Sequence, residues 1–142
     1  MATAVKFHCY AEDLAHGVHD FSTDVLKVML SNTAPDAAAD TVDGDIVEIT
    51  PEDGYVAGGE TVVVTAEGQT GGVYTLTAND VVFTPDNPGS FGPAQYPVLY
   101  NSSKGTAGNR PLISYWDRGT PSTPTDGVPL TVDVTGALIT VQ

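Results

Sequence analysis

Short runs rich in valine, threonine and other β-branched or aromatic residues recur along this chain, and turn-forming residues close each run. The 142 residues include 15 glycines and 10 prolines. Glycine and proline at this density interrupt long helices but suit the turns between strands. The pattern predicts an all-β fold, a β-sandwich or jelly roll of about eight strands. The predicted strands span residues 25–30, 45–50, 60–67, 72–78, 80–84, 95–101, 111–117, 128–135 and 137–142.

Several connections between these runs carry turn signals. GQTGG, residues 68–72, supplies glycines for the positive backbone φ of a tight turn. TGA, residues 135–137, predicts a hairpin between the last two strands, and the glycines of GYVAGGE, residues 54–60, predict a turn that enters a strand. Alternation in LTVDV predicts a core-facing set made of Leu130, Val132 and Val134.

One helix is predicted, over residues 5–17. Apolar residues recur there at helical spacing, and Gly17 is available to end the helix. The length of the chain fits one domain. The sequence therefore predicts a single β-sandwich domain over residues 1–142, with the helix at 5–17, strands within 24–142, and a proline-rich surface loop at 117–127.

The charge balance argues against several classes of partner. Five lysines and arginines stand against 18 aspartates and glutamates, a formal net charge of −13. Binding to a phosphate backbone needs clustered cations, so nucleic acid is not predicted as a partner, and the same acidity repels an anionic membrane. No apolar run approaches the roughly 18 to 20 residues of a membrane span. The single cysteine excludes an internal disulfide framework and fits synthesis in a reducing cytoplasm.

Candidate residues for catalysis or metal binding lack the spacing that such chemistry needs. His8, His16 and His19 are the only histidines, and a glycine separates the second from the third, so no metal site is predicted. The acidic stretch within residues 36–53 departs from the spacing of a calcium loop and predicts a solvated loop, with loose ion binding left open. There is no nucleophile motif, and Cys9 is interpreted as a small apolar residue. We therefore expect a protein that is not an enzyme and has no cofactor.

Four aromatic residues lie on two consecutive predicted strands joined by a loop over residues 102–110: Tyr96, Tyr100, Tyr115 and Trp116. Strand alternation places Ile113, Tyr115 and Asp117 on one face. The opposite face then holds Leu112, Ser114 and Trp116. Only one of the two neighbouring aromatics can face the core. The other packs under another element, forms a subunit interface, or offers a platform for carbohydrate or another small ligand.

Positive charge gathers in the same part of this acidic chain, at Lys104, Arg110 and Arg118. A basic edge on an acidic protein favours docking between copies of the chain. The interface predicted from the aromatic and basic residues together consists of Tyr100, Arg110, Tyr115, Trp116 and Arg118.

Six segments, taken in order, resemble a family of small virion structural proteins encoded by tailed bacteriophages. They are YAEDLAHGVHDFSTDVLKVMLSNTAP, GYVAGG, DVVFTP, YPVLYN, PLISYWDRG and LTVDVTGALITV. The resemblance spans nearly the whole chain, and the order of the segments is more specific than any one of them. It implies a component of the virion and carries no catalytic residues.

By size and fold class, an acidic β domain of this kind is similar to capsid decoration, or cement, proteins. The resemblance then implies a location on the outer capsid surface after synthesis in the host cytoplasm, where the protein stabilises contacts between capsomers. Its expected partners are the major capsid protein and copies of itself. The alternatives are a tail-associated structural protein of the tube, baseplate or fibre, or a carbohydrate-binding module on the virion surface.

Overall fold

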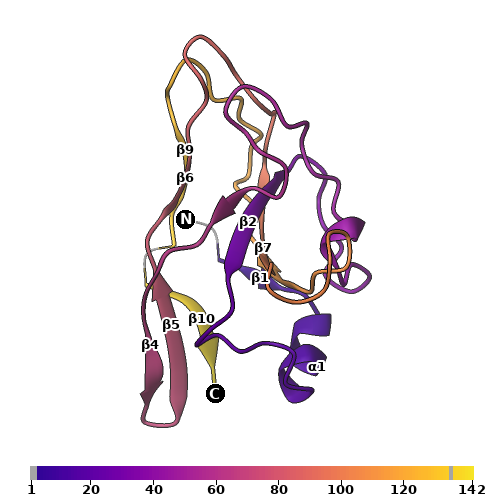
Figure 1. The fold of residues 1–142 in the computed structure, drawn as a ribbon, viewed down its shortest axis with the longest axis vertical. Coiled ribbons are helices and arrows are strands. Elements are labelled where there is room, and N and C mark those ends of the chain that lie inside the picture. Colours follow the sequence, from indigo (N-terminus) through magenta and orange to yellow (C-terminus); the bar gives the residue numbers. More distant parts are fainter. Residues whose placement is uncertain (1–2, 135) are drawn as a thin grey trace.

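A computed structural model describes residues 3–134 and 136–142 of the chain (Figure 1). Within these residues, ten strands form three antiparallel sheets, with one short α-helix and one 3-10 turn. The all-β prediction is confirmed. The helix α1 is Cys9–Ala15 and the 3-10 turn η1 is Asp43–Asp45. The strands are β1 Val5–Lys6, β2 Leu26–Ser31, β3 Glu60–Thr61, β4 Val64–Thr70, β5 Val73–Ala78, β6 Val81–Phe83, β7 Tyr96–Asn101, β8 Leu112–Tyr115, β9 Leu130–Val132 and β10 Ala137–Val141.

The largest sheet has five strands in the order β1-β8-β7-β2-β3. A second sheet has the order β10-β5-β4, and the third is the pair β6-β9. The hairpin of β4 and β5 projects at the same end of the molecule as α1, on the other side of β10 (Figure 1). No helix in the described part of the chain combines the length and apolar character needed to cross a membrane.

Both faces of the five-stranded sheet are buried, because alternate residues of its central strands enter different hydrophobic clusters. Leu26, Val28 and Leu30 of β2 join the larger cluster, which also takes residues from β5, β6, β9 and β10. Met29 joins a smaller cluster on the opposite face, together with Val98, Tyr100 and Leu112. The apolar run at 25–30 is therefore a strand with two covered faces, the arrangement expected for near-continuous apolar sequence.

The predicted helix at 5–17 is wrong at its start. Val5 and Lys6 extend the large sheet as β1, paired with Tyr115 and Ser114 of β8, and the helix begins only at Cys9. Helical periodicity at the N-terminus is overridden here by a tertiary contact, the free edge of β8. The predicted end is close to the observed one, since Gly17 follows the last turn with a φ of +68°.

The strand predicted at 45–50 is also wrong. The carboxylate of Asp45 accepts the backbone N–H groups of Thr41 and Val42 at 2.9 and 3.1 Å, which closes the turn η1 instead. Beyond it, only an isolated bridge joins Glu48 to Ser31. Ile46 and Ile49 anchor this segment in the two different clusters and are buried without a ladder, while Val47 between them is 62% exposed.

The run at 60–67 divides between two sheets. Its first part is β3, in the large sheet, and its later part is β4, in the sheet with β5 and β10. The change occurs at Val62 and Val63, of which the first is buried and the second is 57% exposed. The sequence does not reveal where the chain passes from one sheet to the other, because both parts are extended and rich in β-branched residues.

The hairpin prediction for residues 68–72 is confirmed, whereas the one for residues 135–137 is wrong. Thr70 pairs with Val73 across the two-residue turn between β4 and β5. In contrast, β9 pairs with β6 and β10 pairs with β5, so the last two strands belong to different sheets. Residue 135 lies outside the described residues. The alternation in β9 and the residues directly after it is as predicted, with all three core-facing positions buried: Leu130, Val132 and Val134.

Candidate docking surface

Two of the five residues predicted at an interface lie in the interior. Tyr100 is 0% and Trp116 is 4% exposed. The Tyr100 hydroxyl donates to the Gly58 carbonyl at 2.7 Å, so its polar atom is also satisfied within the chain. These side chains therefore offer no surface for a second subunit or a carbohydrate in this conformation. Tyr115, Arg110 and Arg118 keep partial exposure.

A bulge in β8 explains the position of Trp116. Leu99 pairs with Ser114, but its neighbour Tyr100 pairs with Leu112, so one extra residue is inserted in β8. A bulge of this kind shifts the alternation of the strand. As a result, Ile113 and Trp116 join the same cluster, although strict alternation predicted opposite faces. The aromatic left on the other face, Tyr115, packs against Phe7 with ring centroids 5.3 Å apart.

The three cations predicted to form a basic edge are each held by a partner within the chain. Lys104 pairs with Asp24 at 3.2 Å, and Arg110 pairs with Asp43 at 3.8 Å. Arg118 donates to the hydroxyl of Ser122 at 2.8 Å. Their contacts therefore brace loops of the same chain, and docking through a basic edge stays a prediction.

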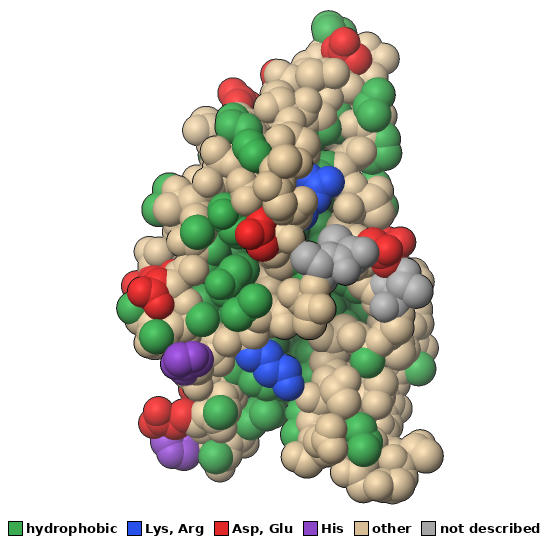
Figure 2. Space-filling model, turned by 180° about the vertical axis from the view of Figure 1, so that it is seen from behind, with side chains coloured by type: hydrophobic (Ala, Val, Ile, Leu, Met, Phe, Trp, Pro, Cys, Tyr) green, Lys and Arg blue, Asp and Glu red, His purple; other side chains and the backbone are tan. Residues whose placement is uncertain are grey.

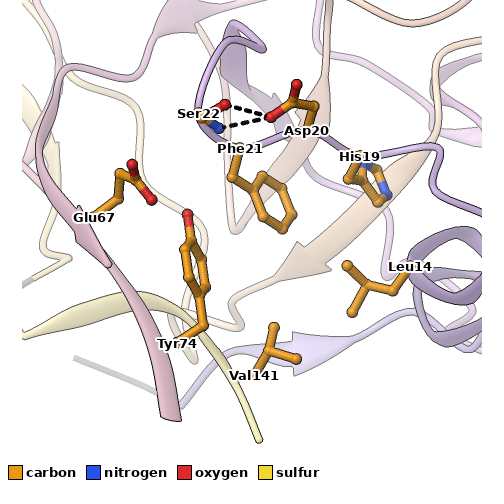
Figure 3. A pocket seen from close by; sticks show the side chains of 8 residues that line it. All are labelled: Leu14, His19, Asp20, Phe21, Ser22, Glu67, Tyr74 and Val141. Carbon is orange, nitrogen blue, oxygen red and sulfur yellow. Dashed lines mark hydrogen bonds between the residues drawn. The ribbon is translucent and has the colours of Figure 1, made fainter. Parts of the chain in front are cut away.

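An apolar cleft opens instead between α1 and the β10-β5-β4 sheet. It has a volume of about 340 Å³, and a neighbouring cavity of about 310 Å³ shares Leu14 and Val141 with it. Figure 3 shows the side chains that line the first of these cavities. Figure 2 shows the hollow at this end of the molecule, with hydrophobic side chains gathered in it. We call the first cavity the docking cleft; its lining residues are Leu14, His19, Asp20, Phe21, Ser22, Glu67, Tyr74 and Val141.

Aromatic rings form one wall of the docking cleft. His19 and Phe21 stack with centroids 5.4 Å apart, and Phe21 stacks on Tyr74 at 6.3 Å. Burial, and then the neighbouring carboxylate of Glu67, raise the pKa of Tyr74 to about 12. Asp20 makes a smaller contribution in the same direction to this value, so two carboxylates act on the Tyr74 hydroxyl. The cleft is therefore apolar inside and negative at its rim.

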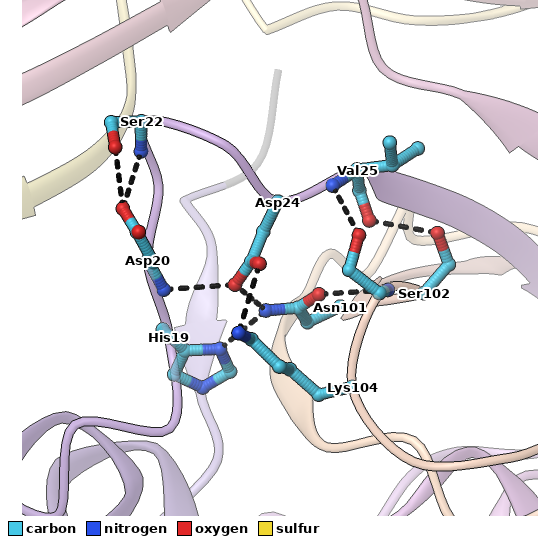
Figure 4. Close-up of polar contacts among 9 residues, drawn as sticks. His19, Asp20, Ser22, Asp24, Val25, Asn101, Ser102 and Lys104 are labelled. Carbon is cyan, nitrogen blue, oxygen red and sulfur yellow. Dashed lines mark hydrogen bonds and ion pairs between the residues drawn. The ribbon is translucent and has the colours of Figure 1, made fainter.

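The segment 18–24, which carries Phe21, is fastened to the end of β7 by a polar network (Figure 4). The side chain of Asp24 is only 4% exposed and accepts the amide of Asn101 at 2.6 Å. It also accepts the backbone N–H of Asp20 at 2.8 Å. Burial alone would raise the pKa of Asp24, but these hydrogen bonds and Lys104 outweigh it and leave that pKa below its usual value.

His19 belongs to the same network in its neutral form. The side-chain oxygen of Asn101 accepts the N–H of Ser103 at 3.0 Å, so its amide nitrogen faces Nδ1 of His19, also at 3.0 Å. Because the Asn101 amide is the donor, Nδ1 of His19 must accept this hydrogen bond, and Nδ1 of a protonated imidazole cannot accept one. Burial lowers the pKa of His19 below 6.5, and Lys104 adds to this, against the opposite effect of Asp13 and Asp24.

Stability should therefore fall as the pH drops below about 6.5. Because the folded pKa of His19 lies below the unfolded one, the unfolded chain binds more protons in this range. We expect the free energy of unfolding, measured by urea titration at pH 7.5 and 5.5, to decrease at the lower pH. His19→Gln should reduce that decrease, while His16→Gln, at the exposed residue that directly follows α1, should keep it. An unchanged decrease in His19→Gln would contradict the assignment.

Next to the docking cleft, the β4–β5 hairpin forms an arm. All seven residues of β4 are exposed, and β5 is its only strand partner among the described residues. Natural edge strands are commonly protected by charged side chains, proline or a β-bulge. β4 has neither lysine nor proline; it carries one charged residue, Glu67, and one register shift near its start, between Val64 and Ala66. The arm therefore presents an open strand edge beside an apolar cleft.

Other candidate chemistry is weak. Burial, and then Asp13, raise the pKa of the Cys9 thiol, so Cys9 is not an activated nucleophile. No group of three or more potential metal ligands gathers in residues 3–134 and 136–142. The acidic loop uses Asp43 and Asp45 to accept backbone N–H groups of the chain itself.

The sequence reasoning missed the docking cleft because its walls come from three distant parts of the chain, near residues 14–22, 67–74 and 141. The one sequence signal for this surface was that the predicted strand at 60–67 contains neither lysine nor proline, the residues that often protect an edge strand. No protein-family model, curated protein or solved structure matches this chain.

Proposed function

We propose that this chain is a non-enzymatic structural protein of a tailed-phage virion, and specifically a decoration protein on the outer capsid surface. The observation that carries the proposal is the open edge of β4 beside the docking cleft. For a protein that stays monomeric, an exposed strand edge is a risk, because another chain can pair with it and cause aggregation. An assembly component uses such an edge to receive its partner.

Charge supports the outer surface over the interior of the shell. With a formal net charge of −13, the chain would be repelled by packaged DNA, which carries one phosphate charge per roughly 1.7 Å of its axis. The outer surface imposes no such repulsion. There, many weak contacts on one lattice add up through multivalency.

The role can be tested on washed, gradient-purified particles of the phage that encodes the chain. We expect quantitative mass spectrometry to find the protein in amounts comparable to the major capsid protein, and immunogold labelling to place it on the head. Labelling confined to the tail would replace decoration with the tail-associated alternative. Absence from washed particles would overturn the virion role altogether.

A further inference from the structure

The free edge of β4 has a defined set of hydrogen-bonding groups. In an antiparallel hairpin, residues alternate between pairs that exchange hydrogen bonds and pairs whose backbone groups point outward. The two-residue turn makes Thr70 and Val73 a hydrogen-bonded pair. Gln69, paired with Tyr74, and Glu67, paired with Leu76, therefore direct their backbone N–H and C=O groups away from β5.

This edge is accessible and nearly regular. Its only register shift lies near its start, between Val64 and Ala66, which leaves a continuous run from Ala66 to Thr70. No backbone hydrogen bond to another part of the described chain uses this run apart from its pairing with β5. Gly68, with no side chain, permits close approach of a further backbone.

The side chains along the edge define what a further strand would carry. Glu67 shares a sheet face with its cross-strand partner Leu76, and Gln69 shares it with Tyr74. Leu76 is buried in the larger core and Tyr74 lines the docking cleft, so this face is the inner one. A residue opposite Glu67 on an added strand would therefore meet a carboxylate, with Asp20 also on the rim.

We propose that β4 receives an extended segment of a partner protein as a fourth strand, with a lysine or arginine opposite Glu67 and an apolar side chain directed into the docking cleft. Opposite charges on facing residues of neighbouring strands stabilise the pair. Backbone hydrogen bonds supply affinity, and alternate side chains supply specificity. The inference deepens the proposed function and rests on it for the identity of the partner as a shell protein.

A second copy of the chain is a poor occupant. Antiparallel pairing of two β4 strands about their midpoint would place Glu67 opposite its own copy, since Glu67 is the central residue of Val64–Thr70. Like charges on facing residues destabilise a strand pair. Two chains of formal net charge −13 also repel each other as wholes. The sheet edge and its charge thus favour a basic partner over self-association.

The probe for this inference is a purified phage particle that lacks the protein because its gene is deleted. Binding of recombinant wild-type chain and of variants to these particles would be measured by co-sedimentation. Gln69→Pro removes one outward N–H without removing a bond to β5, and Gln69→Ala is its matched control. Glu67→Arg reverses the facing charge, and Glu52→Arg makes the same change on an exposed loop outside the docking cleft.

We expect Gln69→Pro and Glu67→Arg each to weaken binding at least about tenfold, the scale of one or two lost interactions at such an edge. Gln69→Ala and Glu52→Arg should bind within about threefold of wild type, a difference below 1 kcal/mol. Circular dichroism melts establish that each variant is folded. If wild type binds but both edge variants bind equally well, the inference is wrong while the proposed function stands. If wild type itself does not bind these particles, the proposed function fails.

Hydrogen exchange gives a readout that needs no variant. On binding to the particle, the amides of Glu67 and Gln69 should become protected, because they donate to the added strand. Protection elsewhere with these two amides unchanged would overturn the inference. So would protection of the same amides in the isolated chain with rising concentration, which would identify the occupant as a second copy.

Discussion

Gly59→Ala should destabilise the fold by about 4 kcal/mol, because the new methyl group has no space. Gly59 lies directly before β3 with a φ of +74°, a conformation that L side chains rarely adopt. Its Cβ would overlap the carbonyl oxygen of Val28 and lie 2.7 Å from the Cα of Met29. Both atoms belong to the backbone of β2, an interior strand of the large sheet whose side chains enter both clusters, so they cannot move aside without disturbing both clusters.

Gly17→Ala is the matched control for this substitution. Gly17 has a similar φ of +68°, but an added Cβ would meet nothing within 4 Å. The free energy of unfolding of Gly17→Ala should fall by only about 1 kcal/mol, the cost of the left-handed conformation alone. Thermal unfolding checks the pair, and we expect the melting temperature of Gly59→Ala to fall by roughly 15 °C. Equal losses in both variants would show that close packing at Gly59 contributes nothing.

Asn101→Ala should cost about 3 kcal/mol, the second largest effect expected. Asn101 is fully buried and donates at 2.6 Å to the carboxylate of Asp24, which is itself buried. It also accepts the N–H of Ser103 and contacts His19. Alanine would leave a buried carboxylate with fewer partners and detach the segment 18–24 from the end of β7.

Ser102→Ala is the matched control, because it removes a hydrogen bond that is exposed rather than buried. The hydroxyl of Ser102 donates to the Val25 carbonyl at 2.7 Å in an exposed setting, so its loss should cost about 1 kcal/mol or less. Urea unfolding of both variants would measure the difference. In Asn101→Ala, hydrogen exchange of the amides of segment 18–24 should also quicken. A loss in Asn101→Ala no larger than in Ser102→Ala would contradict the role assigned to this buried network.

Part of this architecture follows from local sequence. Gly71 and Gly72 between two alternating runs are sufficient to predict the β4–β5 hairpin, because the turn needs positive φ at both positions. Gly17 marks the end of α1 for a similar local reason. The faces of Leu130 and Val132 follow from alternation in a strand without a bulge.

Other features depend on partners that are distant in the sequence. Val5 falls within the range predicted as helix but lies in a strand, because the edge of β8 is available to pair with it. Trp116 is buried on the same side as Ile113 because β7 and β8 pair through a bulge. The candidate site also depends on distant partners, because strand pairing leaves β4 at a sheet edge and the fold brings Phe21 beside Tyr74.

The sequence by itself determined that this chain is an acidic all-β protein with few cations, because turn residues, alternation and charge act locally or are simple sums. Tertiary structure decided which strands share a sheet, which aromatic side chains are buried, and where an open edge meets an apolar cleft. Strand pairing is the physical reason, since each strand's hydrogen bonds are completed by residues far along the chain, and a single inserted residue shifts the faces that follow.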